Sequence, residues 1–267
     1  MADLSLKGIQ HFGGIAADDD PILMEAFEEH DAYISAKNFQ TTIILGRKGS
    51  GKTAIFKKIT TQRDFETFSL GFTFRHYPWD HHNLQKQHNV SAESCFRESW
   101  IYFICLNAAT MVVHDDASTS LKQDSLVHHQ QLREFLSDSF GQTRPSFTSI
   151  FSPQRRFKFG GRFGLPEIGF SADTIEAKDL PKFYSQINDY ILNTVLGCMN
   201  SDHSYHLCFD ELDFEFDLNS TDYYSKLIGL IRAAMHINRL ARDRGKKFSI
   251  IIFLRDDIYG SFESRVG

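Results

Sequence analysis

Residues 46–53 read Gly-Arg-Lys-Gly-Ser-Gly-Lys-Thr and match the phosphate-binding pattern G-x-x-x-x-G-K-[ST]. The apolar, β-branched segment Thr41–Leu45 precedes this motif and is typical of a buried parallel strand. The segment Lys52–Thr60 follows it with apolar residues at helical spacing. A strand that enters a glycine-rich turn and continues as a helix is the context that the motif requires. We therefore expect an α/β fold with a phosphate site at this turn, the alternative being a flexible Gly/Lys surface loop.

Each part of the motif has a physical role in binding a nucleoside triphosphate. The glycines let the backbone wrap around phosphates, and the following helix offers them its positive N-terminal end. We expect Lys52 to reach the β- and γ-phosphates and the Thr53 hydroxyl to bind Mg2+. The predicted cofactors are ATP and Mg2+. The residues expected to contact the nucleotide are Gly46, Arg47, Lys48, Gly49, Ser50, Gly51, Lys52, Thr53 and Ala54.

A second apolar segment, His206–Phe209, ends on the acidic pair Asp210-Glu211. In P-loop ATPases a Walker B strand ends on an aspartate that holds Mg2+, and a glutamate directly after it orients and deprotonates the attacking water. We therefore expect Asp210 to be a metal ligand and Glu211 to be the catalytic base. Two alternatives stay open: acidic and apolar residues alternate as far as Leu218, as in an exposed edge strand, and Asp213 is a second-choice metal ligand.

The apolar segment Phe248–Leu254 predicts another buried strand, which ends on Arg255, Asp256 and Asp257. In many ATPases a polar residue at the end of the strand beside Walker B senses the γ-phosphate, and Arg255 occupies that position. The alternative is a solvated loop with local ion pairs of little energetic value. The predicted catalytic set is Glu211, Lys52 and Arg255.

The whole chain, residues 1–267, is expected to form one domain in which strands and helices alternate around a mostly parallel sheet. Residues 1–40 predict an irregular leader and a helix that begins at Pro21 with Asp20 as its cap. Residues 61–200 predict a variable helical region with a hairpin insertion near 150–172. The elements expected after Thr60 are a strand over Phe68–Tyr77 and helices over Glu93–Val113, Ser120–Ser137, Pro181–Gly197 and Asp222–Arg242. The apolar stripe of the last helix is expected to contain Tyr224, Leu227, Ile228, Ile231 and Met235.

The composition is ordinary for a soluble globular protein, with 42% hydrophobic and 24% charged residues. The net charge of -5 argues against a basic surface, so the binding of nucleic acid is unsupported. Four isolated cysteines form no CxxC pair, which argues against a cysteine zinc site and fits a reducing cytoplasm. The N-terminal residues lack a signal-peptide layout, and no apolar run approaches the roughly 20 residues that span a bilayer. We therefore expect a cytoplasmic protein with no membrane partner.

Two further clusters have competing interpretations. A histidine-rich segment suggests a metal site, but it lacks a familiar ligand spacing, so a solvated loop is the preferred interpretation. Its members are His76, His81, His82 and His88. Basic residues interleaved with phenylalanines suggest a site for single-stranded nucleic acid, and the preferred alternative is a half-buried hairpin. These residues are Arg155, Arg156, Phe157, Lys158, Phe159, Arg162 and Phe163.

Together, residues 41–60, 205–213 and 248–257 resemble the ASCE division of P-loop ATPases, with a layout closest to its AAA+-related and STAND branches. The segment Leu254–Tyr259 and the leader Phe12–Ile22 are similar to a group of bacterial P-loop ATPases that occur in mobile or phage-defence contexts. The resemblance implies ATP hydrolysis that switches conformation, assembly or a partner effector in such contexts. It also implies self-association or an effector protein or domain as the partner.

The resemblance implies a three-layer sandwich whose mostly parallel sheet has the strand order 5-1-4-3-2. The Gly46–Thr53 motif follows strand 1, Asp210 ends strand 3 and Arg255 ends strand 4. The sequence stops at Gly267, which leaves no room for strand 5 or for the helical lid of AAA+-type proteins. We therefore expect either a piece of a longer protein or a site covered by the early helices.

Two other functions stay open at this stage. One is a nucleotide-loaded scaffold that hydrolyses ATP slowly or never. The other is a phosphotransferase that acts on a small molecule or a polynucleotide end. The phosphotransferase predicts an acceptor pocket and a cluster of lid arginines, for which Arg144 and the Arg155-Arg156 pair are the candidates.

Overall fold

The computed structural model describes residues 23–62, 64–74, 92–115, 123–146, 149–150, 157–158, 174–175, 184–213 and 221–266. Within these residues the chain is an α/β protein with seven helices and a four-stranded, all-parallel sheet. The strands of this sheet are β1 (Ile43–Gly46), β2 (Thr67–Thr73), β5 (Ser204–Asp210) and β6 (Phe248–Arg255).

The strands lie side by side in the order β1-β6-β5-β2. This is the order 1-4-3-2 that the resemblance implies for these four strands, and no strand of the described chain pairs with the outer edge of β1. The register places Gly46 beside Arg255 and Thr73 beside Asp210. Since all the strands are parallel, their carboxyl ends share one edge of the sheet.

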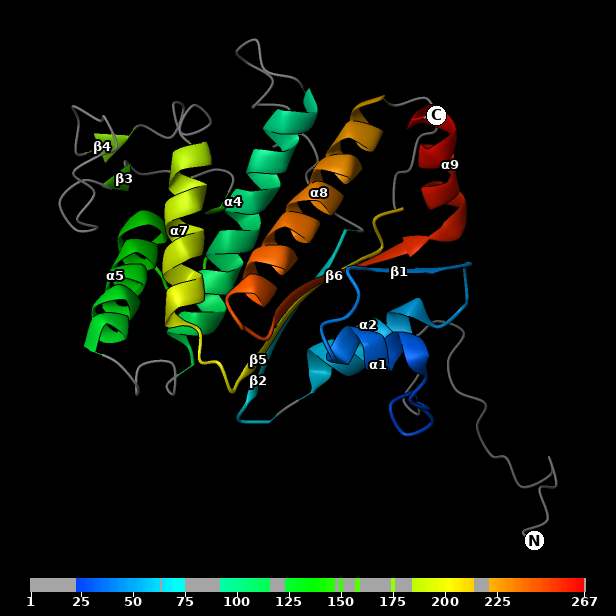
Figure 1. Ribbon diagram of the computed structural model, residues 1–267, viewed down its shortest axis with the longest axis horizontal. Helices are drawn as coiled ribbons and strands as arrows, with labels where there is room; N and C mark the ends of the chain where they lie inside the picture. Colours follow the sequence, from blue (N-terminus) through cyan, green and yellow to red (C-terminus); the bar gives the residue numbers. More distant parts are fainter. Residues whose placement is uncertain are drawn as a thin grey trace, which may run out of the picture.

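Helices cover both faces of the sheet, which is compatible with a three-layer sandwich (Figure 1). The helices α4 (Ala92–Val113) and α8 (Thr221–Asp243) lie on one face; α7 (Tyr184–Cys198) packs beside α4, and α5 (Gln123–Phe140) packs against both α4 and α7. On the other face lie α1 (Asp31–Lys37) and α2 (Lys52–Thr61). The last helix, α9 (Asp256–Val266), follows β6 without a loop.

The two inner strands, β5 and β6, explain this layering, because they are buried on both faces and their side chains alternate between two cores. Cys208, Ile251 and Phe253 pack with α1 and α2. Leu207 and Ile252 pack into the larger core under α4 and α8. Each core removes a different set of apolar side chains from water, so the sheet is stabilised from both sides.

Most of the expected elements are confirmed with small shifts at their ends. The strands around 41–45, 206–209 and 248–254 and the helices around 93–113 and 222–242 are present. The expected strand over Phe68–Tyr77 is confirmed for its described part, and the helix expected at Ser120–Ser137 lies at Gln123–Phe140. The helix expected to end at Gly197 includes that residue.

Two expectations about local structure are wrong. Residues 23–30 form turns and irregular backbone, and the first described helix is Asp31–Lys37, not a helix that begins at Pro21. A few apolar residues over two turns do not stabilise an isolated helix, and Phe27 instead packs edge-on against Tyr33. Near the hairpin expected at 150–172, Phe157–Lys158 pairs antiparallel with Thr174–Ile175, and the residues between these strands lie outside the described chain.

The second wrong expectation concerns α8, where Met235 is 57% exposed instead of inward. The buried face of α8 is rotated toward small residues, because the helix approaches α4 closely. A Cβ added at Gly229 would lie 3.0 Å from the backbone nitrogen of Arg97 on α4. Ala233 and Ala234 are fully buried on the same face.

Within the described residues, each helix is too short or too polar to cross a membrane.

Candidate functional site

The glycine-rich loop between β1 and α2 is shaped by its glycines. An added Cβ at Gly46 would lie 2.4 Å from the Oγ of Ser50, so the loop closes tightly on itself. Gly49 and Gly51 have φ angles of 81° and 86°, in the left-handed region that favours glycine. A mixture of right- and left-handed residues is the backbone pattern that forms concave anion sites. Residues 47–51 are exposed and therefore accessible to a ligand.

The helix α2 presents its N-terminal end to this loop. It begins at Lys52 and has no acidic residue in its first turn, so no carboxylate of its own offsets the positive end of the helix dipole. The Nζ of Lys52 donates hydrogen bonds to the carbonyl oxygens of Gly46 (2.7 Å) and Arg47 (2.8 Å). The ammonium group therefore lies across the loop, where a bound anion would meet its charge.

Asp210 lies at the carboxyl end of β5 and is only 3% exposed. Its Oδ1 accepts a hydrogen bond from the backbone N–H of Glu211 (2.8 Å), whereas its Oδ2 has no hydrogen-bond partner within the described chain. Burial raises the pKa of Asp210, and the Glu211 N–H, the Thr53 hydroxyl and the Lys52 ammonium partly oppose this effect. The carboxylate thus lies near the first turn of α2 with one oxygen unsatisfied.

The Thr53–Asp210 pair fits a magnesium ion. Nearly all buried polar atoms in proteins have a partner, so the unsatisfied Oδ2 of Asp210 requires an explanation. Mg2+ binds oxygen ligands and is usually held by one or two protein groups together with phosphates and water. The Thr53 hydroxyl and the Asp210 carboxylate are such groups, and they come from the two segments in which the sequence predicted them.

Glu211 has a left-handed backbone with φ of 56°, which it shares with only one other non-glycine residue of the described chain, Phe39. This conformation costs a non-glycine residue about 1–3 kcal/mol and persists only where the surroundings hold it, often at functional sites. The Glu211 side chain is half-buried, and its charge contributes to raising the pKa of Asp210. Strain at the expected position of the catalytic base is consistent with a functional role.

Arg255 ends β6 directly beside Gly46 and is held by two carboxylates. Its Nε and Nη2 donate to the two oxygens of Asp257 (3.0 and 2.6 Å), and its Nη1 donates to Asp213 (3.2 Å). Both carboxylates raise the pKa of Arg255, and Asp257 has the larger effect. Asp213 therefore pairs with Arg255 within the described structure, and Asp210 is the carboxylate near Thr53.

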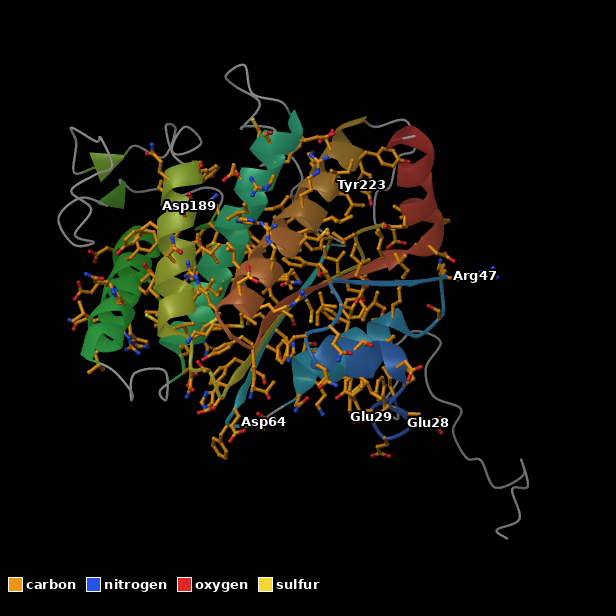
Figure 2. All side chains as sticks on the ribbon, viewed as in Figure 1. Glu28, Glu29, Arg47, Asp64, Asp189 and Tyr223 are labelled. Atoms are coloured by element: carbon orange, nitrogen blue, oxygen red, sulfur yellow. The ribbon has the colours of Figure 1, made fainter. Side chains whose placement is uncertain are left out.

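An open hollow of about 430 Å3 lies beside the loop and is lined by Arg47, Lys48, Arg255, Asp256 and Asp257. Arg47 lies at the end of β1 (Figure 2), and its Nε is 3.8 Å from the Oδ2 of Asp256. The sequence had suggested only local ion pairs for Asp256 and Asp257. The structure places both in the first turn of α9, where acidic side chains are favoured. Two consecutive acidic residues after the apolar strand could therefore have predicted the start of this helix.

A larger hollow of about 590 Å3 runs along β2 and α4, and none of the residues 46–53 lines it. Arg144, the described candidate for a lid arginine, lines this distant hollow instead of the glycine-rich loop. We therefore place the candidate site at the loop, where the motif residues, the helix end and the buried carboxylate converge.

The structure brings together the predicted residues Lys52, Thr53, Asp210 and Glu211, and it places Arg255 beside the start of the loop. The alternative in which Asp210 ends an exposed edge strand is wrong, because β5 lies between β6 and β2. The histidine cluster, Arg155, Arg156 and Arg162 lie outside the described residues. Within those residues, no group of three or more His, Cys, Asp or Glu side chains is placed to share a metal ion.

Comparison of the chain with protein-family models, with curated proteins and with solved structures gives no match.

Proposed function

We propose that this chain is an ASCE-type P-loop domain that binds Mg-ATP at Gly46–Thr53 and hydrolyses it. The observation that carries the proposal is the unsatisfied, buried Oδ2 of Asp210 near Thr53, at the base of a glycine-rich loop whose backbone is shaped for an anion. The position of β6 between β1 and β5 supports the same assignment, because the ASCE resemblance implies this order.

In this proposal the loop and the α2 N-terminus bind the phosphates, and Lys52 exchanges its two carbonyl partners for phosphate oxygens. Thr53 and Asp210 would hold Mg2+, which when bound would supply positive charge that offsets the charge of the phosphates. Arg255 gives up a carboxylate partner to contact the γ-phosphate.

Glu211 orients a water molecule and accepts its proton as the water oxygen bonds to the γ-phosphorus. The bond between the γ-phosphorus and the bridging oxygen breaks at the same time, which leaves ADP and inorganic phosphate. The Glu211 carboxylate then returns its proton to solvent. No other group of the chain changes its covalent state.

The conformational part of the proposal rests on the pair Arg255–Asp257. Asp257 belongs to the first turn of α9, so a γ-phosphate that attracts Arg255 weakens a contact that fixes the start of this helix. Hydrolysis and phosphate release restore the pair. The nucleotide cycle would therefore move α9, which is the element that we expect to signal to a partner or to a second copy of the chain.

The test is to measure ATP binding and phosphate release for the wild type and for Glu211→Gln. We expect Glu211→Gln to bind ATP normally and to lose turnover by about a hundredfold or more, since general-base catalysis contributes roughly this much. Glu66→Gln is the matched control. This exposed glutamate precedes β2, whereas Glu211 follows β5, so the two residues lie at opposite ends of the parallel strands. ATP binding without phosphate release in the wild type would instead indicate a nucleotide-loaded scaffold.

A further inference from the structure

The buried Tyr223 attaches the turn that carries Glu211 to α8. The Oη of Tyr223 donates a hydrogen bond to the backbone carbonyl of Leu212 at 2.6 Å. Leu212 is fully buried, and Tyr223 is 7% exposed in the first turn of α8. Figure 2 shows Tyr223 at the end of α8 that lies next to α9.

Several contacts hold the residues 210–213 in their observed shape. The Glu211 N–H donates to Asp210, the Leu212 carbonyl accepts from Tyr223, and the Asp213 carboxylate pairs with Arg255 at 3.2 Å. The first contact is local to the turn, and the third lies in the hollow where Arg255 is one-third exposed. From outside the turn, the buried Phe74 N–H donates to the Asp210 carbonyl (3.2 Å) on the side before Glu211, and Tyr223 is a buried donor on the side after it.

We propose that Tyr223 is a positioning residue that keeps Glu211 in its left-handed conformation and so aims its carboxylate at the attacking water. This inference rests on the proposed function. The φ of 56° at Glu211 is unfavourable by itself, so a fixed contact on each side of the residue is needed to maintain it. The Asp210 side chain provides the contact on one side, and the Tyr223 hydroxyl provides it on the other.

The loss of the Tyr223 hydroxyl leaves the buried Leu212 carbonyl without this donor, and the turn relaxes toward ordinary backbone angles. The phosphate-binding loop belongs to β1 and α2, so the binding of ATP is unaffected. A displacement of the Glu211 carboxylate by about 1 Å is sufficient to slow a reaction by roughly a hundredfold. Tyr223→Phe therefore separates turnover from binding.

The experiment compares Tyr223→Phe with Tyr224→Phe. Tyr224 is the neighbouring tyrosine of α8, and its hydroxyl bonds the Ser261 hydroxyl of α9 (3.2 Å). We expect Tyr223→Phe to lower kcat by about tenfold to a hundredfold with unchanged affinity for ATP, and Tyr224→Phe to leave both unchanged. In a Glu211→Gln background, Tyr223→Phe should cause no further loss, because it acts through Glu211. An unchanged kcat, or equal losses in kcat and affinity, would overturn the inference.

A second readout is independent of turnover. Hydrogen exchange of the backbone amides at residues 210–213, measured without nucleotide, should be faster in Tyr223→Phe than in the wild type and in Tyr224→Phe. Unchanged exchange means that Tyr223 does not hold the turn. A wild type that releases no phosphate refutes the proposed function itself, while the exchange comparison still decides whether Tyr223 positions Glu211.

Discussion

Replacement of Asp210 with asparagine is expected to stabilise the nucleotide-free protein and to remove its response to Mg2+. The carboxylate is buried with an unsatisfied Oδ2, and burial raises its pKa, so the folded protein disfavours the charged form. A buried polar atom without a partner costs about 1–3 kcal/mol. Asparagine has nearly the same shape and carries no charge, and its amide hydrogens can be donated to the nearby Thr53 hydroxyl. We therefore expect Asp210→Asn to raise the free energy of unfolding by about 1–3 kcal/mol at neutral pH.

The sign of the pH dependence follows from the raised pKa. The cost of the Asp210 charge is present at pH values above its folded pKa and disappears as the pH falls toward 3.8, the ordinary value of an aspartate. The stability advantage of Asp210→Asn should therefore be greatest near neutrality and shrink in acid.

Thermal unfolding with and without Mg-ATP measures both effects. Each kcal/mol corresponds to about 2–4 °C in Tm for a domain of 150–250 residues. The wild type should gain Tm from ATP and gain more when Mg2+ is added, and Asp210→Asn should lose the Mg2+-dependent part. Asp213→Asn is the control, since Asp213 is one-third exposed and paired with Arg255, so no gain in stability is expected. A lower Tm for Asp210→Asn, or an intact Mg2+ response, would refute this reasoning.

Three further predictions test other parts of the account. Gly71→Ala should destabilise the fold by about 1–3 kcal/mol in denaturant unfolding, because the added Cβ would lie 2.5 Å from the Phe56 ring; unchanged stability would contradict the close packing of α2 on β2. Asp257→Asn should raise the affinity for ATP over ADP by up to about fivefold, since it frees Arg255 from an exposed ion pair, and an unchanged ratio of the two dissociation constants would count against Arg255 as the γ-phosphate sensor. Burial lowers the pKa of His206 to about 4, so stability should fall by about 3 kcal/mol as the pH drops from 6.5 toward 4; His206→Gln should lack this slope in unfolding experiments, and the same slope in both proteins would show that His206 is not its source.

The sequence predicted the centre of the fold well, because the inner strands carry their own signal. Phe248–Arg255 is buried along nearly its whole length, and such a strand is a continuous apolar run that has few alternative placements. The glycine-rich loop was equally readable, since left-handed backbone at Gly49 and Gly51 restricts the residues that fit there.

Other features depend on contacts between distant segments and leave no local signal. The bond from Tyr223 to Leu212 and the pairing of Arg255 with Asp213 join residues that are 11 and 42 positions apart. The left-handed conformation of Glu211 has no local signal either, since a glutamate there ordinarily indicates right-handed or extended backbone.

The central claim is that Gly46–Thr53 binds the triphosphate of ATP, and calorimetric titration of Mg-ATP tests it most directly. The wild type should bind one ATP per chain. Lys52→Ala should bind at least about tenfold more weakly, because a charged hydrogen bond contributes about 1.5–3 kcal/mol. Lys48→Ala, which alters an exposed lysine of the same loop, should have a smaller effect. Equal affinity of Lys52→Ala and the wild type for ATP would contradict the account.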